Sequence, residues 1–270
     1  GHEGLALVAG LAAKVGPPWR QAAHRPSPIA LHPGPVLTFA TGARGTTQTT
    51  VNADAALLAL GGASWPRLGT DGSWVGMLTQ AGVAVTTLEA ANCGLEIGWS
   101  EPLKSRRAGE PLKRIALSIA GQRFTGELII TRYGLEGGPA YAAGPLVRAA
   151  LKADVPTAVA GSSECGIELT LDLRPDFGLD ALATRLARPR GKQSTANFLR
   201  KAAALSPVAI ALLREAAGGA LPASPASLAS LIKAVTLPVT GLAGLDRAIS
   251  TAGGIALGDI DDGYMLHRRP

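Results

Sequence analysis

The chain has 270 residues, of which 47% are hydrophobic and 17% are charged, and its formal net charge is +6. This composition excludes an intrinsically disordered chain, and the length allows one or two domains with buried cores. Because no apolar run approaches 18 residues and no signal-peptide pattern is present, we expect a soluble, cytoplasmic protein without membrane contact.

Residues 1–33 show no clear period, and the first readable elements follow Val36. The segments VLTFAT and TTQTTV predict two short strands joined as a hairpin by a turn at Gly42–Gly45. ADAALLALGG (53–62) predicts a fully buried strand, because it is a continuous apolar run that ends on glycines. DGSWVGMLTQAG predicts a helix with Asp71 or Ser73 as its N-cap and Gly82 at its end.

The next part of the chain, to about residue 175, is rich in predicted strands. Their β-branched or alternating patterns read VAVTTLE (83–89), IALSIAG (115–121), GELIITR (126–132) and GIELTLDL (166–173). GGPAYAAGPLVRAAL (137–151) interrupts them as a predicted short helix.

From about residue 176 to 235 the pattern becomes helical. Leucine and alanine recur at helical spacing between Leu179 and Leu186. Two further helices are each predicted to begin with a Ser-Pro pair, in which Ser206 and Ser224 are N-caps and not nucleophiles. A strand-like segment follows Leu237-Pro238, and the order of elements predicts an α/β architecture interrupted by an inserted module.

Several kinds of chemistry are disfavoured by the residues. Gly62-Ala63-Ser64-Trp65-Pro66 lacks the second glycine of a nucleophile elbow, and the histidines (His2, His24, His32 and His267) lie in weakly patterned ends. We expect no metal site, because no ligand spacing occurs, and we expect Asp259, Asp261 and Asp262 to be solvated. No P-loop or G-x-G-x-x-G motif is present, and we expect Cys93 and Cys165 to be free thiols.

The positive charge gathers in two clusters, which invites a nucleic-acid reading. The clusters are Lys104, Arg106, Arg107, Lys113 and Arg114, and then Arg185, Arg188, Arg190, Lys192, Arg200 and Lys201. Few aromatic residues lie among them to stack on bases, so we expect a solvated basic face. Binding of an anionic nucleotide, or weak nucleic-acid contact, is the alternative.

LALGGASWPRLGTDGSW (58–74) is the strongest candidate for a binding site. Backbone amides at Gly61 and Gly62 could approach a ligand closely, because glycine has no side chain. Trp65 could pack against a planar ring or cover the core, and Arg67 could face a flavin or an acidic substrate or lie on the surface. A plain turn remains the alternative interpretation of this segment.

Four segments resemble, in the same order, parts of the BaiN/YhiN-like (aminoacetone oxidase-like) flavoproteins. ADAALLALGGASWPRLGTDGSW (53–74) resembles the LGGASWP-type subgroup of that family. The other three are ANCGLEIGWSE (91–101), LARPRGKQSTANFLR (186–200) and AISTAGGIALGDIDDGYML (248–266). The resemblance covers about residues 36 to 270.

The resemblance implies an FAD-dependent oxidoreductase that acts on a small-molecule substrate, with NAD(P)H as a possible electron donor. It implies part of a two-dinucleotide-binding-type FAD domain with a β-barrel-like insert and a helical insert. The expected domains are a partial FAD-binding α/β domain at 1–84, the β-barrel-like insert at 85–175, the helical insert at 176–236 and return strands at 237–270. The residues carried over to the FAD site are Gly61, Gly62, Ala63, Ser64, Pro66, Gly69, Asp71, Gly72, Gly253 and Gly254.

The family's G-x-G-x-x-G segment and its closing A-G-E and G-G-Y segments have no counterpart here. We therefore expect an interior fragment of a larger flavoprotein, inactive by itself and unable to hold FAD tightly. No catalytic acid or base is assigned. The alternative function is a non-catalytic basic module, derived from a flavoprotein, that binds a nucleotide or nucleic acid. The substrate, the electron acceptor and the oligomeric state are left open.

Overall fold

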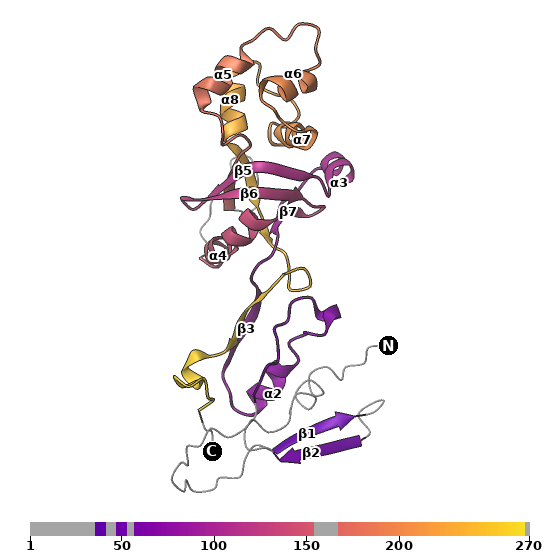
Figure 1. Cartoon of the computed structure of the whole chain (residues 1–270), viewed down its shortest axis with the longest axis vertical. Coiled ribbons are helices and arrows are strands. Elements are labelled where there is room, and N and C mark those ends of the chain that lie inside the picture. The colour runs from indigo at the N-terminus through magenta and orange to yellow at the C-terminus, as the bar shows by residue number, and fades with distance from the viewer. Residues whose placement is uncertain (1–35, 42–46, 53–56, 154–166, 268–270) are drawn as a thin grey trace, which may run out of the picture. The chain divides into compact units, whose positions relative to one another are not determined.

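Residues 36–41, 47–52, 57–153 and 167–267 are described by the structure, a computed structural model (Figure 1). The chain divides into two units, of which unit 1 is Gly1–Leu88 with Gly253–Pro270 and unit 2 is Glu89–Ala252. Unit 2 is therefore an insertion in the sequence of unit 1. The finer domain boundaries expected from the sequence remain a prediction.

The predicted hairpin of unit 1 is confirmed. Strand β1 (Val36–Thr41) pairs with β2 (Thr47–Asn52) in antiparallel register, from Val36 opposite Asn52 to Thr41 opposite Thr47. Threonine and valine favour this extended pairing because their branched side chains fit a pleated surface. The turn predicted at Gly42–Gly45 lies outside the described residues.

The buried strand predicted at 53–62 is wrong for its described part. Residues 57–62 form no strand, and Leu57 is 81% exposed. A strand needs a hydrogen-bonded neighbour, and no described strand pairs with this segment. Leu58 and Leu60 instead pack as half-buried side chains on a small cluster of Trp74, Leu78 and Val83.

The predicted helix after the glycine-rich loop is confirmed as α2 (Trp74–Gln80), with Ser73 at the N-cap position. The Ser73 side chain makes no capping hydrogen bond. Asp71 Oδ1 instead accepts from the Ser73 amide at 2.9 Å. Gly82, with φ +79°, follows the end of the helix.

The chain enters and leaves unit 2 through a pair of hydrogen-bonded strands. Strand β3 (Val85–Ala90) pairs with β11 (Thr251–Ile255) in a two-stranded sheet. A short 3₁₀ helix, η3 (Leu257–Asp259), follows β11. Both strands were predicted, and their pairing joins the two ends of the insertion.

Unit 2 is built on a seven-stranded antiparallel sheet in the order β10-β4-β7-β6-β5-β8-β9. The two outermost strands are consecutive in the chain, since only Thr240 separates them, and the Thr240 amide donates to Glu96 O at 3.0 Å. One segment thus pairs with both edges and closes the sheet as a barrel. The strands are β4 (Leu95–Glu96), β5 (Pro111–Ile119), β6 (Gln122–Ile130), β7 (Gly134–Glu136), β8 (Ile167–Asp172), β9 (Val235–Val239) and β10 (Gly241–Leu242).

In Figure 1 the helices of residues 179–233 gather at one end of this barrel, and the helix of residues 138–152 lies against its strands on another side. The helix predicted at 137–151 is confirmed as α4 (Gly138–Lys152). The predicted Ser-Pro starts are confirmed, because Ser206 and Ser224 accept from the amides of Ala209 and Ser227. The remaining helices are α3 (Glu101–Arg107), α5 (Leu179–Leu186), α6 (Thr195–Ala202), α7 (Pro207–Ala216) and α8 (Pro225–Lys233).

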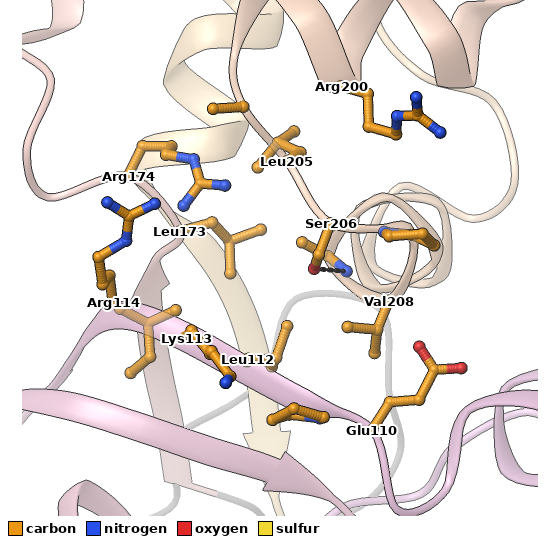
Figure 2. A pocket seen from close by; sticks show the side chains of 15 residues that line it. Glu110, Leu112, Lys113, Arg114, Leu173, Arg174, Arg200, Leu205, Ser206 and Val208 are labelled. Atoms are coloured by element: carbon orange, nitrogen blue, oxygen red, sulfur yellow. Dashed lines mark hydrogen bonds between the residues drawn. The ribbon is translucent and has the colours of Figure 1, made fainter.

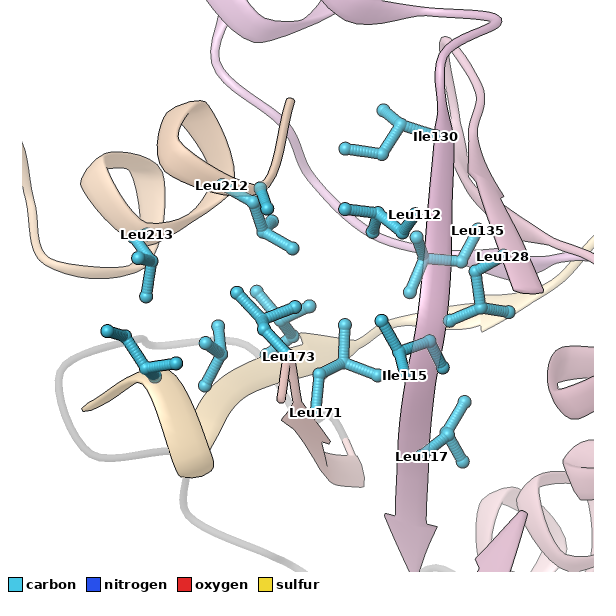
Figure 3. Packing of buried hydrophobic residues seen from close by; sticks show 14 of the residues in the cluster. Leu112, Ile115, Leu117, Leu128, Ile130, Leu135, Leu171, Leu173, Leu212 and Leu213 are labelled. Atoms are coloured by element: carbon cyan, nitrogen blue, oxygen red, sulfur yellow. The ribbon is translucent and has the colours of Figure 1, made fainter. Parts of the chain in front are cut away.

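A single hydrophobic core joins the barrel of unit 2 to its helices (Figure 3). Alternation along the strands supplies it, since Leu128 and Ile130 of β6 are buried and Ile129 between them is 37% exposed. Leu171 of β8 and Leu212 of α7 belong to the same core. The barrel and the helices therefore form one folding unit.

No single helix among the described residues is long and apolar enough to cross a membrane. Helices α6 and α7 pass that test of length and composition only as a pair, with a bend of 113° between them.

Candidate functional site

The loop predicted to face a ligand, residues 61–73, consists of several tight turns that follow one another. Gly61 and Gly72 have φ values of +73° and +74°, and Trp65 is left-handed at φ +53°. The 3₁₀ helix η2 (Pro66–Leu68) begins on Pro66 and ends on Gly69, whose amide donates to Pro66 O at 2.9 Å. Such conformations favour glycine and account for much of the glycine content of this loop.

The side chain of Thr70 links the two ends of this loop. Its Oγ1 donates to Ser64 O at 2.8 Å, and its Cγ2 would lie 2.9 Å from a Cβ placed at Gly61. A side chain at Gly61 would therefore push this threonine away. Sequence reasoning assigned Gly61 to the approach of a ligand and missed Thr70, whose only signal is its place between Gly69 and Asp71.

Gly72 also lies in close contact with neighbouring side chains. A Cβ there would lie 3.0 Å from both Ala63 Cβ and Leu88 Cδ1. Ala63 is buried, whereas Ser64 is half-buried and Pro66 is exposed. The loop thus packs against β3 through its smallest side chains.

The polar and aromatic residues of the loop are engaged locally. The Arg67 guanidinium carbon lies 4.2 Å from the centroid of the Trp65 ring, a cation–π contact. Hydrogen bonds from Ser73, chiefly from its backbone amide, lower the pKa of the Asp71 carboxyl. Asp71 therefore places a negative charge at the start of α2, which does not favour an anionic ligand there.

The return strand β11 carries the other predicted glycines. A Cβ at Gly253, where φ is +91°, would overlap the carbonyl oxygen of Thr87 in β3. Gly254 has φ +129°, and no atom of the described residues lies within 4 Å of the position its Cβ would take. Its carbonyl accepts from Thr86 Oγ1 at 2.9 Å. Gly253 is required by strand packing, while Gly254 leaves open space beside the backbone.

The two glycine segments meet the same strand of unit 1. Gly72 borders Leu88, and Gly253 borders the preceding residue, Thr87. Leu88 also packs on the small cluster that contains Trp74, whose buried Nε1 finds no acceptor among the residues that the structure describes. A buried N–H without an acceptor costs about 1–3 kcal/mol, so this donor suits a polar group from outside the described residues.

The acidic turn near the end of the described chain is solvated as expected, since Asp261 and Asp262 are exposed and Asp259 is half-buried, but two of its carboxylates also bind backbone amides. Asp259 Oδ2 accepts from the Ala84 amide, and Asp261 Oδ1 accepts from the amides of Gly263 and Met265. These carboxylates organise the backbone around β3 and β11 because backbone N–H groups need acceptors. No cluster with the ligands for a metal ion occurs in the described part of the chain.

Several side chains of the two basic clusters have local partners. Lys104 pairs with Glu101 at 3.1 Å, and Arg107 pairs with Glu110 at 3.0 Å. Arg185 Nε donates to a backbone carbonyl at 2.7 Å. Cys93 is buried and free, whereas Cys165 lies outside the described residues.

Comparison with known families identifies unit 2. Residues 89–250 match the family model described as the HI0933-like protein barrel and H2TH domain. The matched range coincides closely with the barrel and helices of unit 2. No curated protein matched the chain.

Proposed function

Because this chain belongs to the HI0933-like family, the family of the BaiN/YhiN-like flavoproteins, we propose that it forms part of an FAD-dependent oxidoreductase. The family match carries the proposal, although it covers the inserted unit and not the glycine segments. Unit 1 adds an independent argument, since the two glycine segments expected beside FAD border adjacent residues of β3. The LGGASWP subgroup and the two-dinucleotide-binding architecture belong to the same proposal.

The residues of unit 1 fit a cofactor that approaches the backbone. The open space beside Gly254 accepts a ligand atom where any other residue would place a Cβ. The unpartnered Trp74 Nε1 is a donor that a polar ligand group could meet. We propose that Gly253 and Gly254 border the flavin from one side. The opposite side would be formed by the loop residues Gly61, Gly62, Ala63, Ser64, Pro66, Gly69, Asp71 and Gly72.

When bound, FAD supplies the redox chemistry, because its ring system takes up or releases hydride or electrons. The residues of this chain position the cofactor. Thr70 holds the loop closed through Ser64, and Pro66 limits the freedom of the backbone beside it. Asp71 remains ionised to a lower pH than an ordinary aspartate because of its hydrogen bonds with Ser73. A small-molecule substrate and NAD(P)H as electron donor complete the proposal.

The test uses the intact gene product that carries this chain, purified and examined for flavin absorbance and fluorescence. Cofactor released by heat and identified by mass should be FAD. The informative variant is Gly254→Ala, which should weaken FAD binding about tenfold or more, because the methyl group occupies the space proposed for the cofactor.

Gly219→Ala is the control. Gly219 has φ +102°, the same kind of positive φ as Gly254, and no atom of the described residues lies within 4 Å of its Cβ position, but it lies in the turn after α7 of unit 2. It should bear a similar kind of backbone strain without loss of FAD affinity. A colourless protein that takes up no FAD would overturn the proposal. Salt-dependent nucleic-acid binding by such a protein would instead support the basic binding module.

A further inference from the structure

A pocket of about 590 Å³ lies in unit 2 between the barrel strand β5 and the helices α6 and α7 (Figure 2). This volume is in the range of small-molecule sites. Its lining mixes apolar side chains with four cations and one carboxylate. The apolar residues include Leu112, Ile115, Leu173, Leu205 and Val208, and the charged residues are Glu110, Lys113, Arg114, Arg174 and Arg200.

Arg174 is the unusual member, since it is only 7% exposed. Its Nε donates to Ala203 O at 2.7 Å, and its guanidinium forms no ion pair with any carboxylate of the described residues. Burial lowers the pKa of this guanidinium, and the charge of Arg114 lowers it further, against the opposing effect of Asp176. Arginine nevertheless stays protonated in proteins, so a buried charge remains here without an ion-paired carboxylate among the described residues.

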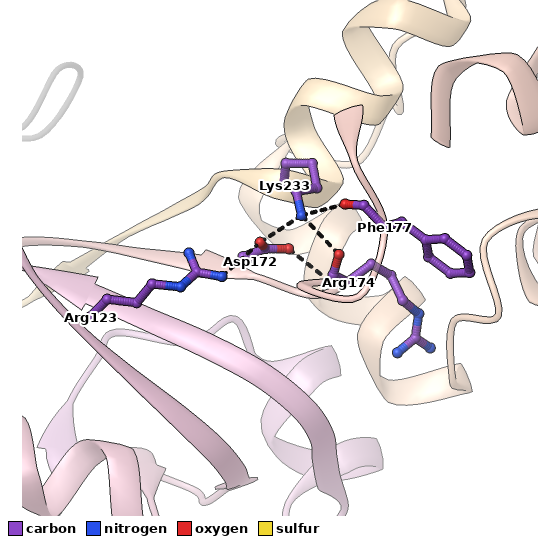
Figure 4. Close-up of polar contacts among 5 residues, drawn as sticks. All are labelled: Arg123, Asp172, Arg174, Phe177 and Lys233. Carbon is purple, nitrogen blue, oxygen red and sulfur yellow. Dashed lines mark hydrogen bonds and ion pairs between the residues drawn. The ribbon is translucent and has the colours of Figure 1, made fainter. Parts of the chain in front are cut away.

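The nearest buried carboxylate is already committed elsewhere (Figure 4). Asp172 Oδ2 lies 2.7 Å from Lys233 Nζ and 3.2 Å from Arg123 Nη2, and its Oδ1 accepts from the Arg174 backbone amide. Lys233 also donates to the Arg174 carbonyl at 2.8 Å. This network holds the backbone of Arg174 and leaves the guanidinium to the pocket.

Arg114 reaches the pocket through an irregularity in β5. The register with β6 shifts between Leu112 and Ile115, so that both of these side chains are buried. Arg114 itself has φ +52°, a left-handed conformation that is rare for a non-glycine residue. Such bulges redirect side chains, and this one places a second guanidinium beside the first (Figure 2).

The other charges of the pocket do not neutralise this pair. The carboxylate of Glu110 lines the pocket but pairs at 3.0 Å with Arg107, which is not part of the lining. Arg200 has no ion-pair partner within the described ranges, and Lys113 approaches Glu127 only to 4.0 Å. The first residues of α7, a helix of ten residues, add the partial positive charge of a helix N-terminus.

We propose that this pocket binds the oxyanion of a small organic molecule, a carboxylate or a phosphate ester, between Arg114 and Arg174. A planar, delocalised guanidinium suits both groups, because its N–H donors match the spacing of two oxyanion oxygens. The apolar part of the ligand lies against the leucine and valine side chains of the same lining. This site lies wholly within unit 2 and does not depend on the proposed flavin site.

A second pocket of about 490 Å³ is also cationic, with Arg188, Arg190 and Arg214 in its lining. Its arginines are exposed, and Arg190 donates to Thr195 Oγ1 at 2.6 Å. Without a buried, unpaired charge it gives no comparable argument for a ligand.

The test measures binding to the intact protein by calorimetry and by thermal shift, with hexanoate, hexyl phosphate, inorganic phosphate and hexanol as probes. We expect hexanoate or hexyl phosphate to bind about tenfold or more tightly than hexanol, and the tighter one identifies the oxyanion. Bound ligand should also raise the melting temperature. Absence of binding by both organic oxyanions at about 1 mM would overturn the proposal.

The key variant is Arg114→Asn, since asparagine tolerates a left-handed backbone and keeps the bulge while the charge is lost. It should weaken the tighter probe about tenfold, and Arg200→Gln should weaken it less. Arg106→Gln is the control, because Arg106 is an exposed arginine in the last turn of α3, as Arg200 is in α6. Equal weakening by Arg106→Gln and Arg114→Asn would show nonspecific attraction and overturn the proposal.

Arg174→Met tests the buried member directly. It should abolish the rise in melting temperature with added oxyanion. If this variant fails to fold, the Arg114→Asn and Arg106→Gln comparison decides the question. Neither result depends on flavin, so failure here and failure of the proposed oxidoreductase function are distinguishable.

Discussion

Lys233 Nζ lies 2.7 Å from Asp172 Oδ2, and this pair fastens the last turn of α8 to the end of β8. The Asp172 side chain is 6% exposed and that of Lys233 is 21% exposed, so water screens the pair only in part. The same lysine donates to the carbonyls of Arg174 and Phe177. One ammonium group therefore ties the helical part of unit 2 to its barrel.

Replacement of Asp172 by Asn should lower the free energy of unfolding of unit 2 by about 2–3 kcal/mol, because it leaves Lys233 charged and partly buried. Urea titration followed by circular dichroism measures the loss. The control is Glu101→Gln, which breaks an exposed pair with Lys104 and should cost below about 0.5 kcal/mol. Similar losses in the two variants would contradict the structural role given to Asp172.

Replacement of Thr70 by Val should loosen the glycine-rich loop while keeping its shape. The hydrogen bond from Oγ1 to Ser64 O is lost, which should cost about 1 kcal/mol of local stability. Hydrogen exchange of the amides between Ser64 and Asp71 should accelerate accordingly. Thr79→Val, at an exposed position of α2, serves as the control. Unchanged exchange in Thr70→Val would show that the hydroxyl does not hold the loop.

Alanine at the two adjacent glycines of β11 should have different effects. Gly253→Ala places a methyl group on the Thr87 carbonyl and should cost several times more stability than Gly254→Ala. The latter meets no described atom and bears only the strain of its φ of +129°, about 1–3 kcal/mol. Thermal unfolding of both variants measures the difference, and equal melting temperatures would contradict the close packing of β11 on β3.

The buried thiol of Cys93 should make the free energy of unfolding decrease as the pH rises into the alkaline range. Burial raises the pKa of its thiol, and Arg148 opposes this effect. The unfolded chain releases the thiol proton at about pH 8.5, whereas the folded chain releases it only at a higher pH. The contribution of Cys93 to the free energy of unfolding is therefore fully present below about pH 8.5 and declines as the pH rises above it. In a Cys165→Ser background, Cys93→Ala should reduce this decline. An unchanged pH profile between about 8 and 10 would refute the prediction.

Local signals account for the elements that the sequence predicted well. Ser206 and Ser224 precede proline at helix starts, and each forms the expected capping bond within its own turn. The hairpin of β1 and β2 likewise depends on neighbouring residues. Such patterns need no knowledge of the rest of the fold.

The errors and omissions concern contacts between distant residues. The apolar run at 53–62 resembled a buried strand, but a strand also requires a partner, which no described residue provides. The two predicted glycine segments do meet one strand, although the ligand itself remains a proposal. Arg174 belonged to neither basic cluster, because its burial and its proximity to Arg114 arise only when β5 and β8 pair.

Because the barrel closes through the segment around Thr240, it can be completed only late in the synthesis of the chain. Strand β4 is made early, but its partner β10 emerges only after all of the helices α5 to α8. A nascent chain that stops before Val235 therefore lacks both β9 and β10 and presents β4 and β8 as open edges, which invite pairing with other chains. Ribosome-bound chains truncated before and after this point should consequently differ sharply in aggregation and in protease resistance.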